Sequence, residues 1–248
     1  MTATTERSDA KPTIVLVHGA FADGSSWNGV IERLLPEGYT VIAPANGLRG
    51  VIADSAYLES VIEQIDGPVL LVGHSYGGAL ISNAGTNHPN VVGLVFVAAY
   101  ATDDGETLSE ASADSKDSVL NEALVQQKYT GENGEMGVEL AINPSRFRDA
   151  FAADLPESQT RLMSATQRPI ASVAFGDRSG PPAWKSLPSW AVLATGDKAA
   201  GTDVIRRMAA RAGADIVEID SSHVVMISHP KEVADVILKA AKSFVSTG

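Results

Sequence analysis

Apolar residues along the first hundred positions form two alternating patterns. The first is a set of short continuous runs rich in Val, Ile and Leu, at residues 13–17, 39–43, 68–72 and 91–99. Runs of this kind are typical of strands buried on both faces of a parallel sheet. The second pattern places apolar residues three or four apart, at residues 26–35, at 56–65 and in a segment that ends near residue 87. This spacing predicts helices, and the alternation predicts a doubly wound α/β arrangement.

The alternation stops after the fourth apolar run. Between residues 101 and 188 there is no strong strand signal, and the helix-like patches are residues 108–128, 144–153 and 156–166. We therefore expect a helical cap, residues 101–188, inserted after the fourth strand.

The alternation then resumes towards the end of the chain. Residues 189–195 and 214–219 have the strand pattern, residues 204–212 have the helix pattern, and a last amphipathic helix begins near Pro230. The sequence thus predicts one α/β core, residues 13–100 and 189–248, with a mostly parallel sheet of about six strands flanked by helices. The polar segment of residues 1–12 is expected to be flexible.

Composition narrows the possible partners. The 248 residues carry a net charge of -11, which argues against a nucleic-acid partner, because phosphate backbones favour clustered Lys and Arg. The chain has no Cys, so disulfides, thiolate metal sites and a cysteine nucleophile are excluded. It shows neither a secretory signal nor a stretch long enough to span a bilayer, so we expect a cytoplasmic protein without a membrane partner.

The strongest chemical signal follows the third apolar run. Residues 73–77 read Gly-His-Ser-Tyr-Gly, after a buried-type strand and before a helix-like segment. This motif forms a sharp strand-to-helix turn that exposes its serine above the sheet edge. We predict that Ser75 is a nucleophile.

A serine nucleophile needs a base. His223 follows the last strand, at the carboxyl edge where open α/β sheets place their sites, and is the predicted base. His18 is expected to brace the loop after the first strand, and His74 to pack beside the nucleophile. His88 is expected to be solvated, and His229 to have a capping or surface role.

The base in turn needs an orienting acid. Asp197 follows the strand at residues 189–195, and the order Ser75, Asp197, His223 is the one expected for this type of serine turn. Asp103 and Asp104, which follow the fourth strand, are alternatives, and Asp177, late in the cap, is a further candidate.

The oxyanion that forms during acyl transfer needs two donors. The predicted donors are the backbone amides of Tyr76, next to the nucleophile, and of Ala20, in the loop after the first strand; the Phe21 amide is the alternative. Phe21, Trp27 and Tyr100 are predicted to wall the substrate pocket, although each is also compatible with a place in the core.

These segments together carry a family resemblance. His-Gly-Ala-Phe at residues 18–21, the serine turn, Gly-Asp-Lys at 196–198 and Ser-His at 222–223 occur in the order found in the α/β-hydrolase superfamily. Residues 223–230 resemble the histidine loop of the small esterases grouped with plant methylesterases and hydroxynitrile lyases. The resemblance implies esterase-type acyl transfer without a metal or cofactor, and a helical cap that sets substrate choice.

Two positions distinguish esterases from lyases within this group. The hydroxynitrile lyases that the chain resembles have Thr after the oxyanion-loop histidine and Lys after the catalytic histidine, where this sequence has Gly19 and Val224. Without a cation to stabilise departing cyanide, hydrolysis is favoured. A serine in the turn also argues against dehalogenase or epoxide hydrolase chemistry.

The sequence therefore predicts a serine hydrolase that cleaves a small or medium ester, acting as a monomer or homodimer. The alternatives are other chemistry at the same Ser-His-Asp site, namely that of a thioesterase, lactonase, carbon–carbon hydrolase, hydroxynitrile lyase or cofactor-free oxygenase. A hydrolase-fold sensor of a small molecule is a further alternative.

Overall fold

The apolar runs form the centre of one parallel sheet. The structure is a computed structural model that describes residues 10–131 and 133–245, so most of the segment predicted to be flexible, residues 1–9, lies outside it. The six strands follow the order β2-β1-β3-β4-β8-β9, and every neighbouring pair is parallel. They are β1 Thr13–Val17, β2 Val41–Ile42, β3 Val69–His74, β4 Val91–Val97, β8 Ser189–Ala194 and β9 Asp215–Ile219. The predicted α/β-hydrolase fold is confirmed.

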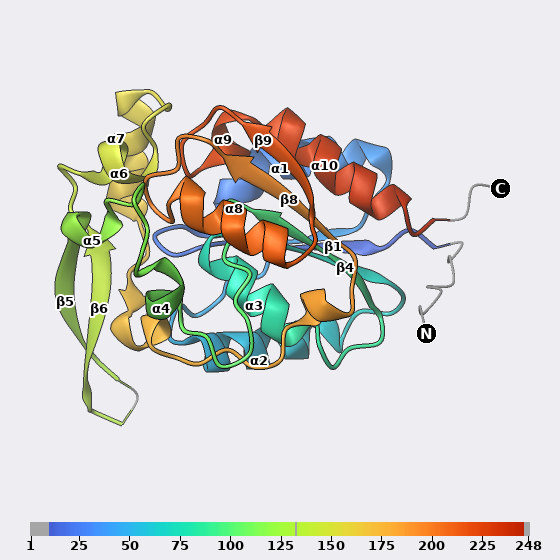
Figure 1. Ribbon diagram of the computed structural model, residues 1–248, viewed down its shortest axis with the longest axis horizontal. Coiled ribbons are helices and arrows are strands. Elements are labelled where there is room, and N and C mark those ends of the chain that lie inside the picture. Colours follow the sequence, from blue (N-terminus) through green and yellow to red (C-terminus); the bar gives the residue numbers. More distant parts are fainter. Residues whose placement is uncertain (1–9, 132, 246–248) are drawn as a thin grey trace.

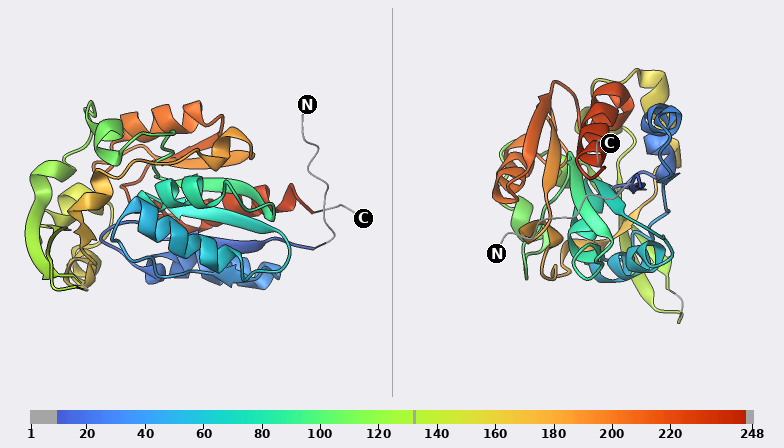
Figure 2. Two further views of the ribbon diagram at one scale, coloured as in Figure 1. Left: turned by 90° about the horizontal axis from the view of Figure 1, so that it is seen from below. Right: turned by 90° about the vertical axis from the view of Figure 1, so that its right-hand side faces the viewer.

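Helices cover both faces of this sheet, as Figures 1 and 2 show. Those of the core are α1 Asn28–Leu34, α2 Val51–Ile62, α3 Tyr76–Ala84, α8 Thr202–Arg211, α9 Val225–Ser228 and α10 Pro230–Lys242. Short 3-10 helices span Gly24–Trp27, Leu35–Glu37, Ser172–Phe175 and Ala183–Lys185. α1 packs against α10, and α2 packs against α3. Every residue of β3 is buried between these layers, which explains its lack of alternation.

Most of the segment between β4 and β8 lies at one end of the sheet, on the side opposite the start of β1 (Figure 1). Its last residues run back along the core, where the 3-10 helix Ala183–Lys185 packs against α3. We call residues 101–188 the insert. Its helices are α4 Leu108–Ser112, α5 Leu120–Ala123, α6 Phe147–Phe151 and α7 Glu157–Thr166.

The insert also contains a second sheet, which the sequence analysis did not predict. β5 Leu124–Thr130, β6 Met136–Ile142 and β7 Ile170–Ala171 pair antiparallel in that order. The predicted helix-like patch at 108–128 is therefore helical only in part, since β5 takes up its last residues. Gln126, Gln127 and Lys128 are exposed on β5, so this strand lacks the apolar run that marks the core strands.

No helix in the described ranges is both long enough and apolar enough to cross a bilayer.

Candidate active site

Ser75 occupies a strained turn between β3 and α3. Its backbone has φ 52° and ψ -121°, a left-handed conformation that a residue with a side chain rarely adopts. A Cβ at Gly73 would lie 2.5 Å from the carbonyl oxygen of Gly77, and one at Gly77 would lie 2.5 Å from that of Val17. Because neither position tolerates a side chain, these glycines allow β1 and α3 to approach closely enough to form the turn.

His223 and Asp197 form a buried pair at the ends of β9 and β8. The ring Nδ1 of His223 lies 2.6 Å from Oδ2 of Asp197, and both side chains are almost fully buried. The other carboxylate oxygen, Oδ1, accepts hydrogen bonds from the backbone amides of Ala199 at 2.8 Å and Ala200 at 3.0 Å. An ionised carboxylate only accepts, so Nδ1 carries the ring proton and Nε2 is left as an acceptor.

The alternative acids lie elsewhere. Asp103 forms an ion pair with Lys185, and Asp104 is exposed at the surface. Within the described chain, neither makes a contact with His223. Asp177 lies beside Gly50. Of the four aspartates considered from the sequence, the structure brings only Asp197 to the histidine.

The loop after β1 passes directly beside the serine turn. A Cβ at Gly19 would lie 2.8 Å from that of Ser75. Of the two amides considered in this loop, that of Phe21 donates to the carbonyl oxygen of Arg168 at 3.1 Å and is thereby occupied. Ala20 lines the same cavity as Ser75, and so does Tyr76, whose amide is at the first position of α3 and has no partner within that helix.

His18 lies beneath this loop and ties it to the rest of the protein. Its Nδ1 lies 2.8 Å from the carbonyl oxygen of Gly19, and its Nε2 lies 3.2 Å from the amide of Asn46 and 3.3 Å from Nη1 of Arg168. Burial lowers the pKa of His18, which favours the neutral ring that this arrangement needs, with Nδ1 donating and Nε2 accepting.

His74 packs behind the base rather than facing the cavity. It is fully buried, and its Nε2 donates to the carbonyl oxygen of His223 at 3.1 Å. Burial, and then the neighbouring charge of His223, lower the pKa of His74 well below 6.5. His74 is therefore neutral near pH 7 and holds the backbone of His223 without adding a second cation.

A small cavity joins these groups. Ser75, His223, Ala20 and Tyr76 all line it, and its volume is about 20 Å³. Five apolar residues of the insert close it, namely Leu108, Leu120, Phe151, Ile170 and Phe175. No sequence motif marks these residues, although Leu108, Leu120 and Phe151 fall in the predicted helix-like patches at 108–128 and 144–153.

The three residues predicted to wall the pocket have different places. Phe21 and Tyr100 line the cavity at Ser75. Trp27 does not, because it is fully buried in the core with its ring packed edge-on against His74, 6.4 Å between centroids. Trp27 is therefore not a wall of this cavity, and instead packs against His74 beneath the site.

Asp154, in the turn that follows α6, is a further residue near the site that no motif marked. Its carboxylate accepts hydrogen bonds from the Ser221 hydroxyl at 3.0 Å and the Ser222 amide at 3.1 Å, and it also contacts the Ser222 hydroxyl. Burial opposes ionisation, but these hydrogen bonds outweigh it and lower the pKa of Asp154. The insert is thus fixed to the loop that carries His223.

The part of the chain that the structure describes contains no cluster of three or more His, Asp or Glu side chains that could hold a metal ion.

A strained serine turn, a buried Asp–His pair and two backbone amides without a partner among the described residues lie together at the carboxyl ends of parallel strands, as in a hydrolase of the α/β type. The chain belongs to the alpha/beta hydrolase family, which it matches over residues 14–236. This confirms the resemblance inferred from the motifs.

Individual relatives extend this result over nearly the whole chain. It is similar to the esterase PIR7B of Oryza sativa subsp. japonica, with 26% identity over an alignment 265 residues long that covers 96% of this chain and 98% of that protein. A pyrethroid hydrolase of Sphingobium wenxiniae is 33% identical over 106 residues, but the match covers only 38% of each protein. The crystal structure of a methylesterase from Arabidopsis has the same fold, with a TM-score of 0.76 at 19% identity over 94% of this chain and 99% of that one.

Proposed function

We propose that the protein is a serine hydrolase that cleaves small or medium carboxylic esters through an acyl-enzyme. The observation that carries the proposal is the buried Asp197–His223 pair on the same cavity as Ser75 and the amides of Ala20 and Tyr76. The similarity to an esterase over 96% of the chain supports ester substrates.

In the first half of the proposed reaction, Ser75 Oγ attacks the carbonyl carbon of the ester while His223 Nε2 takes the hydroxyl proton. The new C–O bond places negative charge on the former carbonyl oxygen, which accepts hydrogen bonds from Ala20 and Tyr76. Breakage of the bond to the alcohol oxygen releases the alcohol, which leaves with the proton from His223. The product is acyl-Ser75.

Water completes the cycle by the same steps. His223 takes a proton from the water, whose oxygen bonds to the acyl carbon. The acid departs, and the proton returns to Ser75 Oγ. Asp197 holds the ring in one orientation and stabilises its charged form, so both halves use the same three side chains.

The surroundings of His223 favour hydrolysis over cyanide release. The residue after it is Val224, which is fully buried, and no Lys or Arg lines the described cavity. A departing cyanide would have no cation beside it.

The test is the turnover of p-nitrophenyl acetate, with a serine-directed phosphonate to locate the reactive residue. We expect S75A to lose turnover and labelling. We expect the matched variant S82A to retain both, because the Ser82 hydroxyl lies on the same helix but bonds to the carbonyl oxygen of Gly78 at 2.8 Å. Full turnover by S75A would overturn the proposal, and labelling of Ser75 without turnover would favour a sensor.

A further inference from the structure

The cavity at Ser75 is too small for the ester it is proposed to cleave. Its volume of about 20 Å³ is enough for roughly one water molecule. Any acyl or alcohol group beyond the reacting atoms must therefore extend past one of the walls. The residues that line the cavity therefore determine which acyl and alcohol groups can bind.

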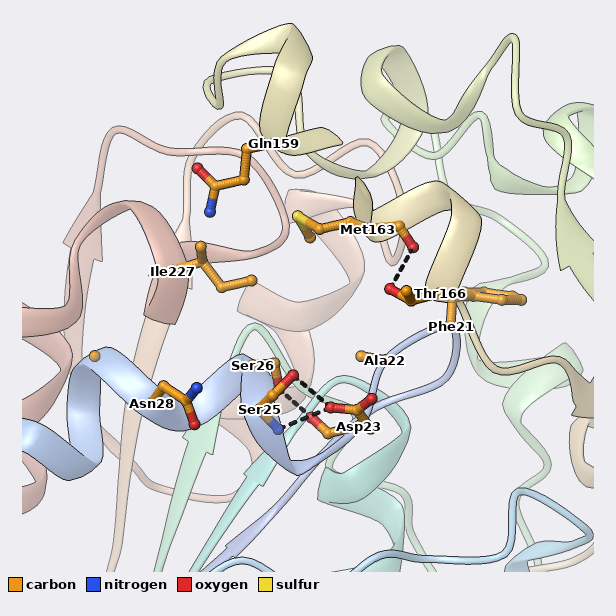
Figure 3. Close-up of a pocket in the computed structure, with 11 residues that line it drawn as sticks. Phe21, Ala22, Asp23, Ser25, Ser26, Asn28, Gln159, Met163, Thr166 and Ile227 are labelled. Carbon is orange, nitrogen blue, oxygen red and sulfur yellow. Dashed lines mark hydrogen bonds between the residues drawn. The ribbon is translucent and has the colours of Figure 1, made fainter. Parts of the chain in front are cut away.

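A much larger cavity lies on the other side of one wall, Phe21. It has a volume of about 380 Å³, within the usual range for small-molecule sites. Phe21 lines both cavities. In Figure 3 its ring points away from the larger cavity, and its ring packs edge-on against Phe151 at 6.0 Å between centroids, on the side of Ser75. We call the larger space the outer cavity.

The outer cavity lies between the core and the insert. In Figure 3, Gln159 and Met163 approach it from α7 and Ile227 from α9. Ser25 lies in the 3-10 helix Gly24–Trp27, and Asn28 at the start of α1. Met163 and Ile227 give it apolar surface. The side-chain amides of Asn28 and Gln159 form no hydrogen bond with other described residues, so they are free to bind a ligand.

Charge restricts what this cavity accepts. Its lining includes no Lys, Arg or His among the described residues, and the carboxylate of Asp23 lies in its wall. The side-chain hydrogen bond from Ser25 lowers the pKa of Asp23, so this group is ionised at neutral pH. The net charge of the chain is also -11. A ligand with its own carboxylate would be repelled.

A second neighbouring space is less suitable. A cavity of about 170 Å³ shares Tyr100, Leu120, Phe175 and Ala199 with the cavity at Ser75. Three of its four serine hydroxyls already donate within the protein: Ser112 to the carbonyl of Leu108 at 2.6 Å, Ser115 to Asp203 at 2.8 Å, and Ser118 to the carbonyl of Ala199 at 2.6 Å. It has less than half the volume of the outer cavity and fewer free donors.

We infer that the outer cavity binds the larger part of an uncharged ester, and that Phe21 forms the boundary which controls its access to Ser75. This inference rests on the proposed function. It adds that the preferred substrates are neutral, with one extended part that has both apolar surface and hydrogen-bonding groups.

The first experiment changes the size of the outer cavity. The readout is the ratio of kcat/KM for a long ester to that for a short one, measured with p-nitrophenyl octanoate and acetate for the acyl side and with octyl and methyl butanoate for the alcohol side. We expect M163W to lower this ratio about tenfold in one of the two series, and F21A to raise it. The matched control is L162W, because Leu162 is on the same helix but 70% exposed, and it should keep the wild-type ratio.

The second experiment changes the charge. We expect wild-type enzyme to discriminate about tenfold against mono-p-nitrophenyl adipate relative to p-nitrophenyl hexanoate, and D23N to reduce this discrimination. The side-chain amide introduced by D23N retains an oxygen that accepts the hydrogen bond from Ser25, so the substitution removes the charge and keeps this contact.

The outcomes separate this inference from the proposed function. If acetate turnover depends on Ser75 but M163W leaves both ratios unchanged, the inference is overturned and the proposed function stands. If N121W, in the second cavity, changes the ratio instead, the long group lies there and the inference is also overturned. If no ester is cleaved, the proposed function itself fails.

Discussion

The two sides of the cavity at Ser75 are built by different means. On the core side, backbone geometry positions the groups of the proposed mechanism: Ser75 is held at φ 52° by neighbouring glycines, and two backbone amides fix the Asp197 carboxylate. On the insert side, single apolar side chains close the cavity from separate elements, such as Leu108 from α4 and Phe151 from α6. The difference indicates that the chemistry is fixed by constraints that allow few sequences, whereas the shape of the pocket is set by side chains that can be exchanged.

The largest expected effect concerns the acid on the core side. We predict that D197N lowers kcat by about 10³ to 10⁴-fold, because an amide at this place no longer stabilises the charged ring of His223 and does not select the reactive tautomer. The measurement is steady-state turnover of p-nitrophenyl acetate. D103N is the control and should remain close to wild type, since Asp103 pairs with Lys185. The opposite result, a loss of turnover in D103N alone, would assign the role of the orienting acid to Asp103, after β4.

A smaller effect is expected from the glycines of the serine turn. We predict that G77A lowers the free energy of unfolding by about 2–3 kcal/mol, because the added methyl group meets the carbonyl oxygen of Val17 at 2.5 Å. Urea unfolding measures the change. In the insert, G176A is the matched control, with its nearest contact at an ordinary 3.7 Å, and it should change stability by less than about 0.5 kcal/mol. Equal losses of unfolding free energy in G77A and G176A would show that the core side of the cavity is no less tolerant of substitution than the insert.

A still smaller effect is expected at the contact between the insert and the core, where Asp154 binds the loop of Ser221 and Ser222. Removing the carboxylate in D154A frees the loop of Ser221 and Ser222, so we predict that kcat falls about tenfold, a change of about 1.4 kcal/mol in the barrier, with KM unchanged. D149A is the control, because Asp149 is exposed and lies in α6, just before the turn that carries Asp154. A rise in KM at constant kcat would show that Asp154 acts on binding rather than on the position of His223.

The smallest effect is expected in the pH dependence of stability. The pKa of buried His74 lies well below its unfolded value of 6.5, so below pH 6.5 the unfolded chain binds more protons than the folded one. The contribution of neutral His74 to the free energy of unfolding is therefore complete above pH 6.5. It is lost as the pH falls towards the pKa of His74 in the folded protein. We predict that the urea midpoint drops between pH 7 and pH 5, and that H74Q shows a shallower drop. An equally steep drop in H74Q would assign the effect to other groups, such as His18.

The same contrast explains what the sequence could predict. The continuous apolar runs identify β1, β3 and β4, and Gly73 and Gly77 identify the turn, because their requirements are local. β5 to β7 could not be predicted in this way, since Gln126 and Lys128 are exposed and the pairing of Glu139 with Ala171 joins residues far apart in the chain. The same holds for Asp154, whose importance depends on a loop 67 positions later.

The hydrogen bond from the Phe21 amide to the Arg168 carbonyl has a consequence for protein engineering. Because of this bond, the insert cannot be exchanged without an effect on the core. The backbone conformation of Phe21, in the loop after β1, depends on Arg168 of the insert. A chimera that exchanges residues 101–188 for the corresponding piece of a relative would need a carbonyl at this place. Without it, Phe21 would lose the anchor for its left-handed backbone (φ 61°), and a graft intended to alter selectivity would instead disturb the neighbouring amide of Ala20, the proposed oxyanion donor. The practical junction for such an exchange is therefore before Arg168 rather than at the start of β8.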